Sequence, residues 1–102
     1  MNLFKIKSLL SQIENAAIIV VGDSPYLHSC EVFGEPEGKP DEEIILFDWH
    51  DDAGQIFEVR LTEKNLDGAK ISDNVISCKD IDGEDVQINL YDLVSSPVVK
   101  VW

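Results

Sequence analysis

The sequence is poor in basic residues. Its 102 residues include 8 lysines and arginines against 20 aspartates and glutamates, which gives a formal net charge of −12. Proteins that bind the nucleic-acid backbone or an anionic membrane surface use clustered Lys and Arg side chains to neutralise phosphates. We therefore expect no direct nucleic-acid binding and no membrane docking. The same imbalance makes a basic protein surface the expected partner, because surfaces of opposite charge attract one another.

Long apolar runs and cysteines are also scarce. The longest apolar run extends from Ala16 to Val21, whereas a membrane-spanning helix needs roughly 20 apolar residues. No apolar stretch of signal-peptide length follows the first residues. Two cysteines, Cys30 and Cys78, are too few for a disulfide framework, although the sequence is compatible with one disulfide between them. These features predict a cytoplasmic protein with reduced thiols.

The motifs that usually carry catalysis are missing. The sequence contains no P-loop, no Gly-x-Gly-x-x-Gly and no Gly-x-Ser-x-Gly. Neither cysteine lies at an expected helix N-terminus or beside a basic cluster, where a thiolate would be stabilised. We therefore expect that the protein is not an enzyme and uses no cofactor.

One segment has a strong helical pattern. Apolar residues recur at three- and four-residue steps from position 3 to position 14, at Leu3, Ile6, Leu9, Leu10 and Ile13. Asn2 is a suitable N-cap, and Asn15 can take the left-handed conformation that ends a helix. Because so short a helix is marginal alone, its apolar stripe must pack against the rest of the chain.

The remainder of the chain predicts short strands separated by turn residues. The expected strands are 16–21, 26–33, 44–50, 55–61, 75–79, 84–91 and 98–102. The Gly- and Pro-rich segment 34–40 predicts a loop and is the one candidate for a mobile segment. One helical turn, capped by Thr62, is expected before Gly68.

These elements predict a single α+β domain over residues 1–102. Its N-terminal helix, within 1–15, packs on a curled antiparallel β-sheet or small barrel of six to seven strands, within 16–102. The expected buried residues are Leu9, Ile13, Ile19, Phe57, Val59, Ile88 and Leu90.

Acidic residues concentrate in one part of the chain. Residues 31–58 contain ten acids and one base, Lys39. Such a field can attract a cationic partner, whereas the alternative interpretation is that it only keeps the protein soluble. The expected partner-binding residues are exposed acids, namely Glu35, Glu37, Asp41, Glu42, Glu43, Asp48, Asp51 and Asp52.

Two sets of residues offer metal ligands. Asp48, His50, Asp51 and Asp52 could hold a divalent cation, but their spacing is not that of an EF-hand loop. The two histidines and two cysteines (His28, His50, Cys30 and Cys78) lack the short spacings of zinc sites. We expect no bound metal, with His28 and both cysteines packed in or beside the core.

The sequence thus predicts a small acidic, non-enzymatic protein-binding module. In its most specific form it is an inhibitor or immunity-type protein that docks on a basic partner surface and presents carboxylates where phosphates would lie. One alternative is a divalent-metal-binding or metal-dependent enzyme domain that uses the segment Asp48–Asp52. Another is a structural subunit that forms homo-oligomers through its C-terminal strand, 98–102.

Overall fold

The computed structural model describes residues 1–92 and confirms the α+β class. Its elements in chain order are α1 (Leu3–Asn15), β1 (Ile18–Val21), β2 (Glu31–Val32), β3 (Glu43–His50), β4 (Ile56–Thr62), α2 (Glu63–Asp67), β5 (Lys70–Ser72), β6 (Val75–Lys79) and β7 (Asp85–Tyr91). The expected strand 98–102 lies outside the described residues.

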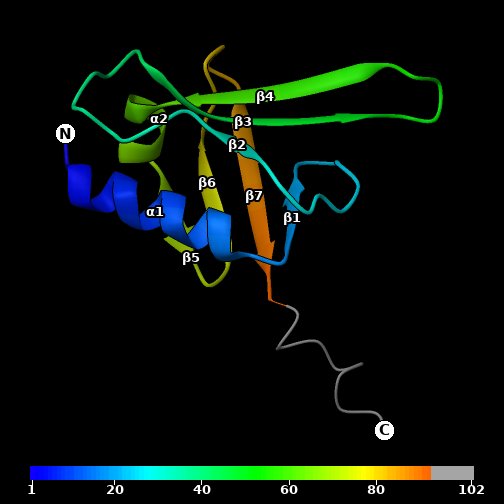
Figure 1. Ribbon diagram of the computed structural model, residues 1–102, viewed down its shortest axis with the longest axis horizontal. Coiled ribbons are helices and arrows are strands. Elements are labelled where there is room, and N and C mark those ends of the chain that lie inside the picture. Colours follow the sequence, from blue (N-terminus) through cyan, green and yellow to red (C-terminus); the bar gives the residue numbers. More distant parts are fainter. Residues whose placement is uncertain (93–102) are drawn as a thin grey trace, which may run out of the picture.

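The strands form two antiparallel sheets and do not close into a barrel. The order in the four-stranded sheet is β1-β7-β6-β5, and in the three-stranded sheet it is β2-β3-β4. Figure 1 shows the long β3–β4 ribbon running across the upper end of the four-stranded sheet. A single curled sheet or small barrel was expected, but the strands divide between two sheets, and β1 pairs with the distant β7, with Ile19 opposite Leu90. This non-local pairing brings the buried positions of both strands to one core beside α1.

Helix α1 begins as its sequence predicts and ends differently. The Asn2 side chain accepts a hydrogen bond from the Lys5 N–H at 3.1 Å. Asn15 stays helical, so its expected left-handed conformation is wrong. Instead, the extended residue Ala16 ends the helix and its N–H donates to the Ile13 carbonyl at 3.2 Å. A left-handed residue would reverse the chain, whereas here the chain continues directly into β1.

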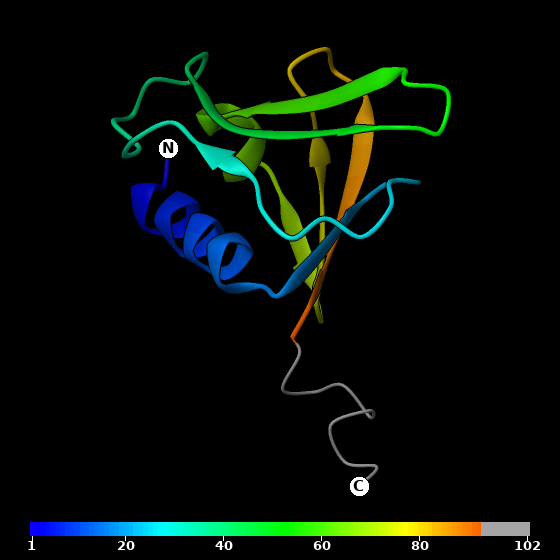
Figure 2. The same cartoon turned by 45° about the vertical axis from the view of Figure 1, so that its right-hand side comes forward.

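The core lies between α1 and the inner faces of the two sheets. Helix α1 covers one side of the four-stranded sheet, as Figure 2 shows. Five of the expected core residues are buried, namely Leu9, Ile13, Ile19, Ile88 and Leu90. Two are not: Phe57 is 37% exposed and Val59 is half-buried. Both lie on the half of β4 nearer the β3–β4 turn, where Val59 packs against the edge of the core opposite Phe47 and Phe57 lies closer to the turn.

The expected strand 26–33 is mostly irregular because this segment passes from one sheet to the other. Leu27 exchanges two backbone hydrogen bonds of 2.8 Å with Ile19 in the four-stranded sheet. Glu31 and Val32 then pair with β3 in the three-stranded sheet. Strand β5 was not expected, since its three residues contain a single apolar side chain, Ile71, which is too few to show an alternating pattern.

Replacing Ile88 by Ala tests the predicted packing of β7. Ile88 is 0% exposed, so the smaller side chain should lower the free energy of unfolding by about 2–5 kcal/mol. Ile71→Ala, on the exposed edge strand β5, is the matched control and should cost less than about 1 kcal/mol. Urea denaturation measures both, and equal losses would show that the packing around Ile88 is misassigned.

Candidate acidic docking site

The structure divides the eight predicted partner-binding acids into two groups. Five precede or begin β3 and are called the loop acids: Glu35, Glu37, Asp41, Glu42 and Glu43. Three lie at the β3–β4 turn or just before it and are called the hairpin acids: Asp48, Asp51 and Asp52. Because β3 rises about 3.3 Å per residue, its ends are about 23 Å apart. The two groups therefore occupy opposite ends of the ribbon in Figure 1 and form no single surface.

A buried carboxylate holds the loop acids in place. Glu63, at the first position of α2, is 1% exposed, and its side-chain oxygens accept hydrogen bonds from two loop amides. The Gly38 N–H donates at 2.9 Å, and the Glu37 N–H is shared between the two oxygens at 3.1 and 3.2 Å. The segment expected to be a mobile loop is thus a loop whose backbone is anchored to α2. The helical turn is predictable from its Thr62 cap, but this role of Glu63 is not, because it depends on a contact between distant residues.

Cations are interleaved with the loop acids. Ion pairs link Glu37 to Lys39 at 3.5 Å and Asp41 to Lys64 at 3.9 Å. Glu35 and Glu42 are exposed as expected and form no ion pair within residues 1–92. This end of the ribbon therefore carries its negative charge together with neighbouring positive charges.

Glu43 has a structural role instead of a fully exposed position. Its Oε2 lies 2.8 Å from Arg60 Nη1, while Arg60 Nη2 lies 2.7 Å from Glu58 Oε2. The hydrogen bonds that Arg60 donates to Glu43 and Glu58 raise the pKa of its guanidinium. Glu43 is half-buried in this arrangement, so it braces β3 against β4.

The hairpin acids lack such cations. Asp51 Oδ1 accepts hydrogen bonds of 2.9 Å from the N–H groups of Ala53 and Gln55, which closes the turn. Asp48 and Asp52 are exposed, and no Lys or Arg pairs with either of them in the described part of the chain. Asp48 also stands directly opposite Glu58 in the strand register. Within residues 1–92, this end of the ribbon thus presents acids with which no Lys or Arg is paired.

An open groove of about 690 Å³ lies beside the hairpin acids. Its apolar walls come from both sheets, and its rim contains Asp51, Asp52 and a third acid, Asp23, from the turn after β1. That turn is fixed by Ser24, whose hydroxyl accepts from the Val21 N–H at 2.9 Å and donates to the Pro25 carbonyl at 2.8 Å. Asp23 was not among the predicted partner-binding acids. Its position two residues after an apolar strand was the signal that could have included it.

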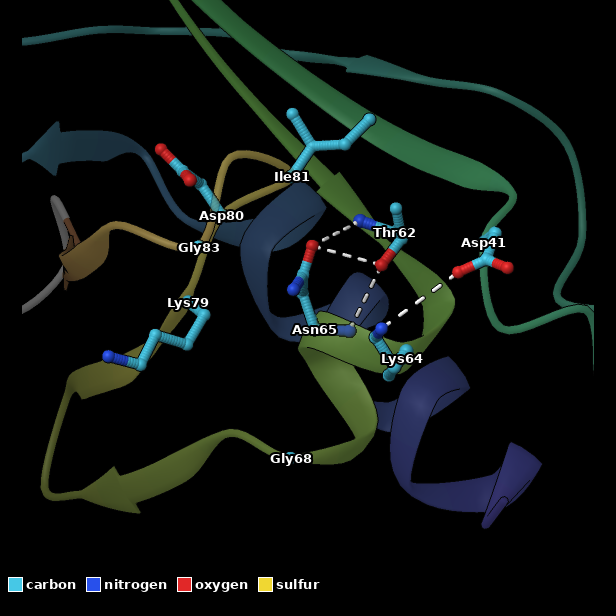
Figure 3. A pocket seen from close by; sticks show the side chains of 9 residues that line it. All are labelled: Asp41, Thr62, Lys64, Asn65, Gly68, Lys79, Asp80, Ile81 and Gly83. Carbon is cyan, nitrogen blue, oxygen red and sulfur yellow. Dashed lines mark hydrogen bonds and ion pairs between the residues drawn. The ribbon is translucent and has the colours of Figure 1, made fainter.

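A second hollow, of about 530 Å³, lies between α2 and the β6–β7 turn (Figure 3). Thr62 and Asn65 form a capping box at its base, with the Thr62 N–H donating to Asn65 Oδ1 at 2.8 Å. Its lysines are paired with acids, since Lys64 contacts Asp41 and Lys79 lies 2.7 Å from Asp85. These side chains satisfy one another, so the hollow is a structural junction between α2 and the adjacent turn.

The potential metal ligands are dispersed. Among residues 1–92, no three His, Cys, Asp or Glu side chains are grouped so that they could hold a metal ion. His28, expected in or beside the core, is exposed, and its Nδ1 lies 3.4 Å from the Ala17 carbonyl oxygen.

Both cysteines are free and half-buried. Burial raises the pKa of Cys30 to about 11, with a smaller contribution from the charge of Glu14. Burial likewise raises the pKa of Cys78 to about 11, with a smaller contribution from Asp80. At neutral pH both are therefore thiols and weak nucleophiles.

No protein-family model matches this sequence, and comparison with curated proteins and with solved structures gives no significant match. In the described part of the chain, no helix has the length and apolar character needed to cross a membrane. The assignment of a function therefore depends on the geometry and charge of the site.

Glu63→Gln tests the anchoring of the loop. The new amide group would place an N–H donor against a loop N–H donor, so the free energy of unfolding should fall by about 1–3 kcal/mol. Amide hydrogen exchange at Glu37 and Gly38 should accelerate, because their acceptor is weakened. Glu58→Gln, which changes an exposed ion pair, is the control and should cost no more than about 1 kcal/mol. Unchanged exchange at both loop amides would contradict the anchoring role.

The cysteines predict a stability loss at alkaline pH. Their folded-state pKa of about 11 exceeds the ordinary value of 9.0, so between these values the unfolded chain loses thiol protons that the folded chain keeps. The contribution of the two thiols to the free energy of unfolding is thus constant below pH 9 and disappears as the pH rises through 11. Urea denaturation from pH 8 to pH 11 should show a steeper decline for the parent protein than for the Cys30→Ala/Cys78→Ala variant. Parallel declines would refute the assignment.

Proposed function

We propose that the protein is a non-enzymatic binding module that docks on a basic surface of a partner protein through the hairpin end of the β3–β4 ribbon. The observation that carries this proposal is the uncompensated charge of that end. Asp48 and Asp52 are exposed acids without an ion pair in residues 1–92, whereas the loop acids are interleaved with Lys39, Arg60 and Lys64.

Exposed apolar side chains beside these acids support the same role. Ile56 is 70% exposed and Phe57 is 37% exposed, and both lie on the strand that follows the hairpin acids. Apolar groups surrounded by charged ones are a common composition for a protein interaction surface. Acids that repel one another cost folding stability, and docking on a cationic partner offsets that cost.

In its most specific form, the proposed partner is a nucleic-acid-binding protein, and the module is its inhibitor or immunity-type protein. The carboxylates of the hairpin end would occupy positions at which the partner binds phosphates. This form rests on the small size and high negative charge of the chain, and on the way the ribbon carries its acids away from the body.

The Asp48→Asn/Asp52→Asn variant tests the proposed location. A partner is first captured from lysate of the source cells with the full chain and purified, and its association rate is then measured at low and high ionic strength. The hairpin variant should associate about five- to tenfold more slowly at low salt and depend less on salt, since exposed interface charges act mainly on the association rate. Asp82→Asn/Glu84→Gln, in the exposed β6–β7 turn, makes the same change in net charge and should have a much smaller effect.

Two outcomes would contradict the proposal. Equal slowing by both variants would show that only net charge matters, and not the hairpin end. Unchanged association by the hairpin variant, together with lower solubility, would show that its acids serve solubility alone.

A further inference from the structure

The groove beside the hairpin acids combines apolar walls with an acidic rim. Val21 and Val86 contribute from the four-stranded sheet, while Trp49, Phe57 and Val59 contribute from the three-stranded sheet. Apolar surface left open between two sheets is unfavourable in water, so a ligand that covers it gains free energy.

The aromatic wall is ordered. Trp49 and Phe57 are register partners across β3 and β4, and their rings are stacked with centroids 5.8 Å apart and an angle of 15° between their planes. The opposite wall is also fixed, because Ser24 bonds both sides of its turn and the Gly22 N–H donates to the Gln87 carbonyl at 2.9 Å. The groove is therefore largely formed before any ligand enters.

The rim adds a charge requirement. Asp23, Asp51 and Asp52 line the groove together with His50, and no Lys or Arg is among the residues within 1–92 that line it. Asp23 and Asp52 are exposed and form no ion pair with the described residues. An anionic ligand would be repelled here, and a purely apolar one would leave these carboxylates without a cation.

We infer that this groove binds an arginine side chain of the basic partner protein, with the guanidinium placed between the Trp49–Phe57 wall and the carboxylates of Asp23 and Asp52. This inference rests on the proposed function and specifies what that function recognises. A guanidinium is planar and weakly hydrated, so its face can lie on an aromatic wall while its N–H groups donate to carboxylates. The compact, strongly hydrated ammonium of lysine fits this combination less well.

Peptide binding to the full chain tests the inference. Trp49 and Trp102 are the only tryptophans, so the Trp102→Phe variant makes fluorescence report on the groove alone. Titration with acetyl-Ala-Arg-Ala-amide should change the Trp49 emission until the groove is saturated with peptide. The citrulline peptide, a neutral isostere, should bind at least tenfold more weakly, and the lysine peptide several-fold more weakly.

Matched variants then locate the binding. The Asp23→Asn/Asp52→Asn variant should bind the arginine peptide about three- to tenfold more weakly, as expected for the loss of two exposed ion pairs. The control Asp82→Asn/Glu84→Gln should leave its affinity unchanged. Phe57→Leu keeps the wall apolar but removes the ring, so it should reduce the preference for arginine over lysine.

Several outcomes would overturn the inference. Equal affinity for the arginine and citrulline peptides would exclude a guanidinium site. A change in Trp49 emission that follows protein concentration, accompanied by dimer formation in sedimentation, would show that a second copy fills the groove. Absence of peptide binding would refute this inference alone if the Asp48→Asn/Asp52→Asn variant still slows association with the partner. Specific arginine binding without any such slowing would instead refute the proposed docking through the hairpin end.

Discussion

The buried carboxylate of Glu63 is the contact on which the arrangement of the acidic segment depends. The carboxylate accepts hydrogen bonds from the Glu37 and Gly38 backbone N–H groups. The backbone N–H of Glu63 donates to the Glu42 carbonyl at 3.0 Å. The next residue, Lys64, donates its N–H to the Pro40 carbonyl at 3.1 Å. The first backbone N–H groups of the five-residue helix α2 thus donate to carbonyl groups of the loop, and N–H groups of the loop donate to the side chain of Glu63 in the helix. This reciprocity sets where β3 begins, and therefore the direction in which the ribbon leaves the body.

The two ends of the ribbon use negative charge differently. Near α2, acids are neighbours of cations and help to brace the chain, as Glu43 does through Arg60. At the turn, only Asp51 is used internally, and the remaining acids face solvent beside a groove with apolar walls. A single acidic segment in the sequence therefore contains one part whose acids pair with cations of the protein and one part whose acids are exposed to solvent.

Local patterns predicted the local parts of the fold. The stripe of α1, the Thr62 cap of α2 and the β6–β7 hairpin all follow from residues close in sequence, and all are present. The pairing of β1 with β7 and the passage of residues 26–33 between sheets depend on distant partners, so alternation alone could not predict them. The alternation of apolar and polar residues also predicted a buried Phe57. This pattern cannot show where a two-stranded ribbon extends past the core that would cover its side chains.

The candidate site shows the same limit. Composition predicted that most of the acids are exposed, but only tertiary structure separates the two groups and adds Asp23 to the hairpin group. Glu63 could not be distinguished in sequence from the other acids, since its burial results from a loop more than twenty residues away.

The register places Asp48 directly opposite Glu58, whose charge Arg60 offsets only in part because the same guanidinium also pairs with Glu43, so the two carboxylates still repel one another across the ribbon. Dissolved salt screens this repulsion, so it tightens the hairpin while it weakens attraction to a cationic surface. The same ions therefore stabilise the hairpin while they weaken its electrostatic attraction to the proposed partner. A cationic partner seated against these carboxylates would replace the screening ions and stiffen the ribbon as it binds.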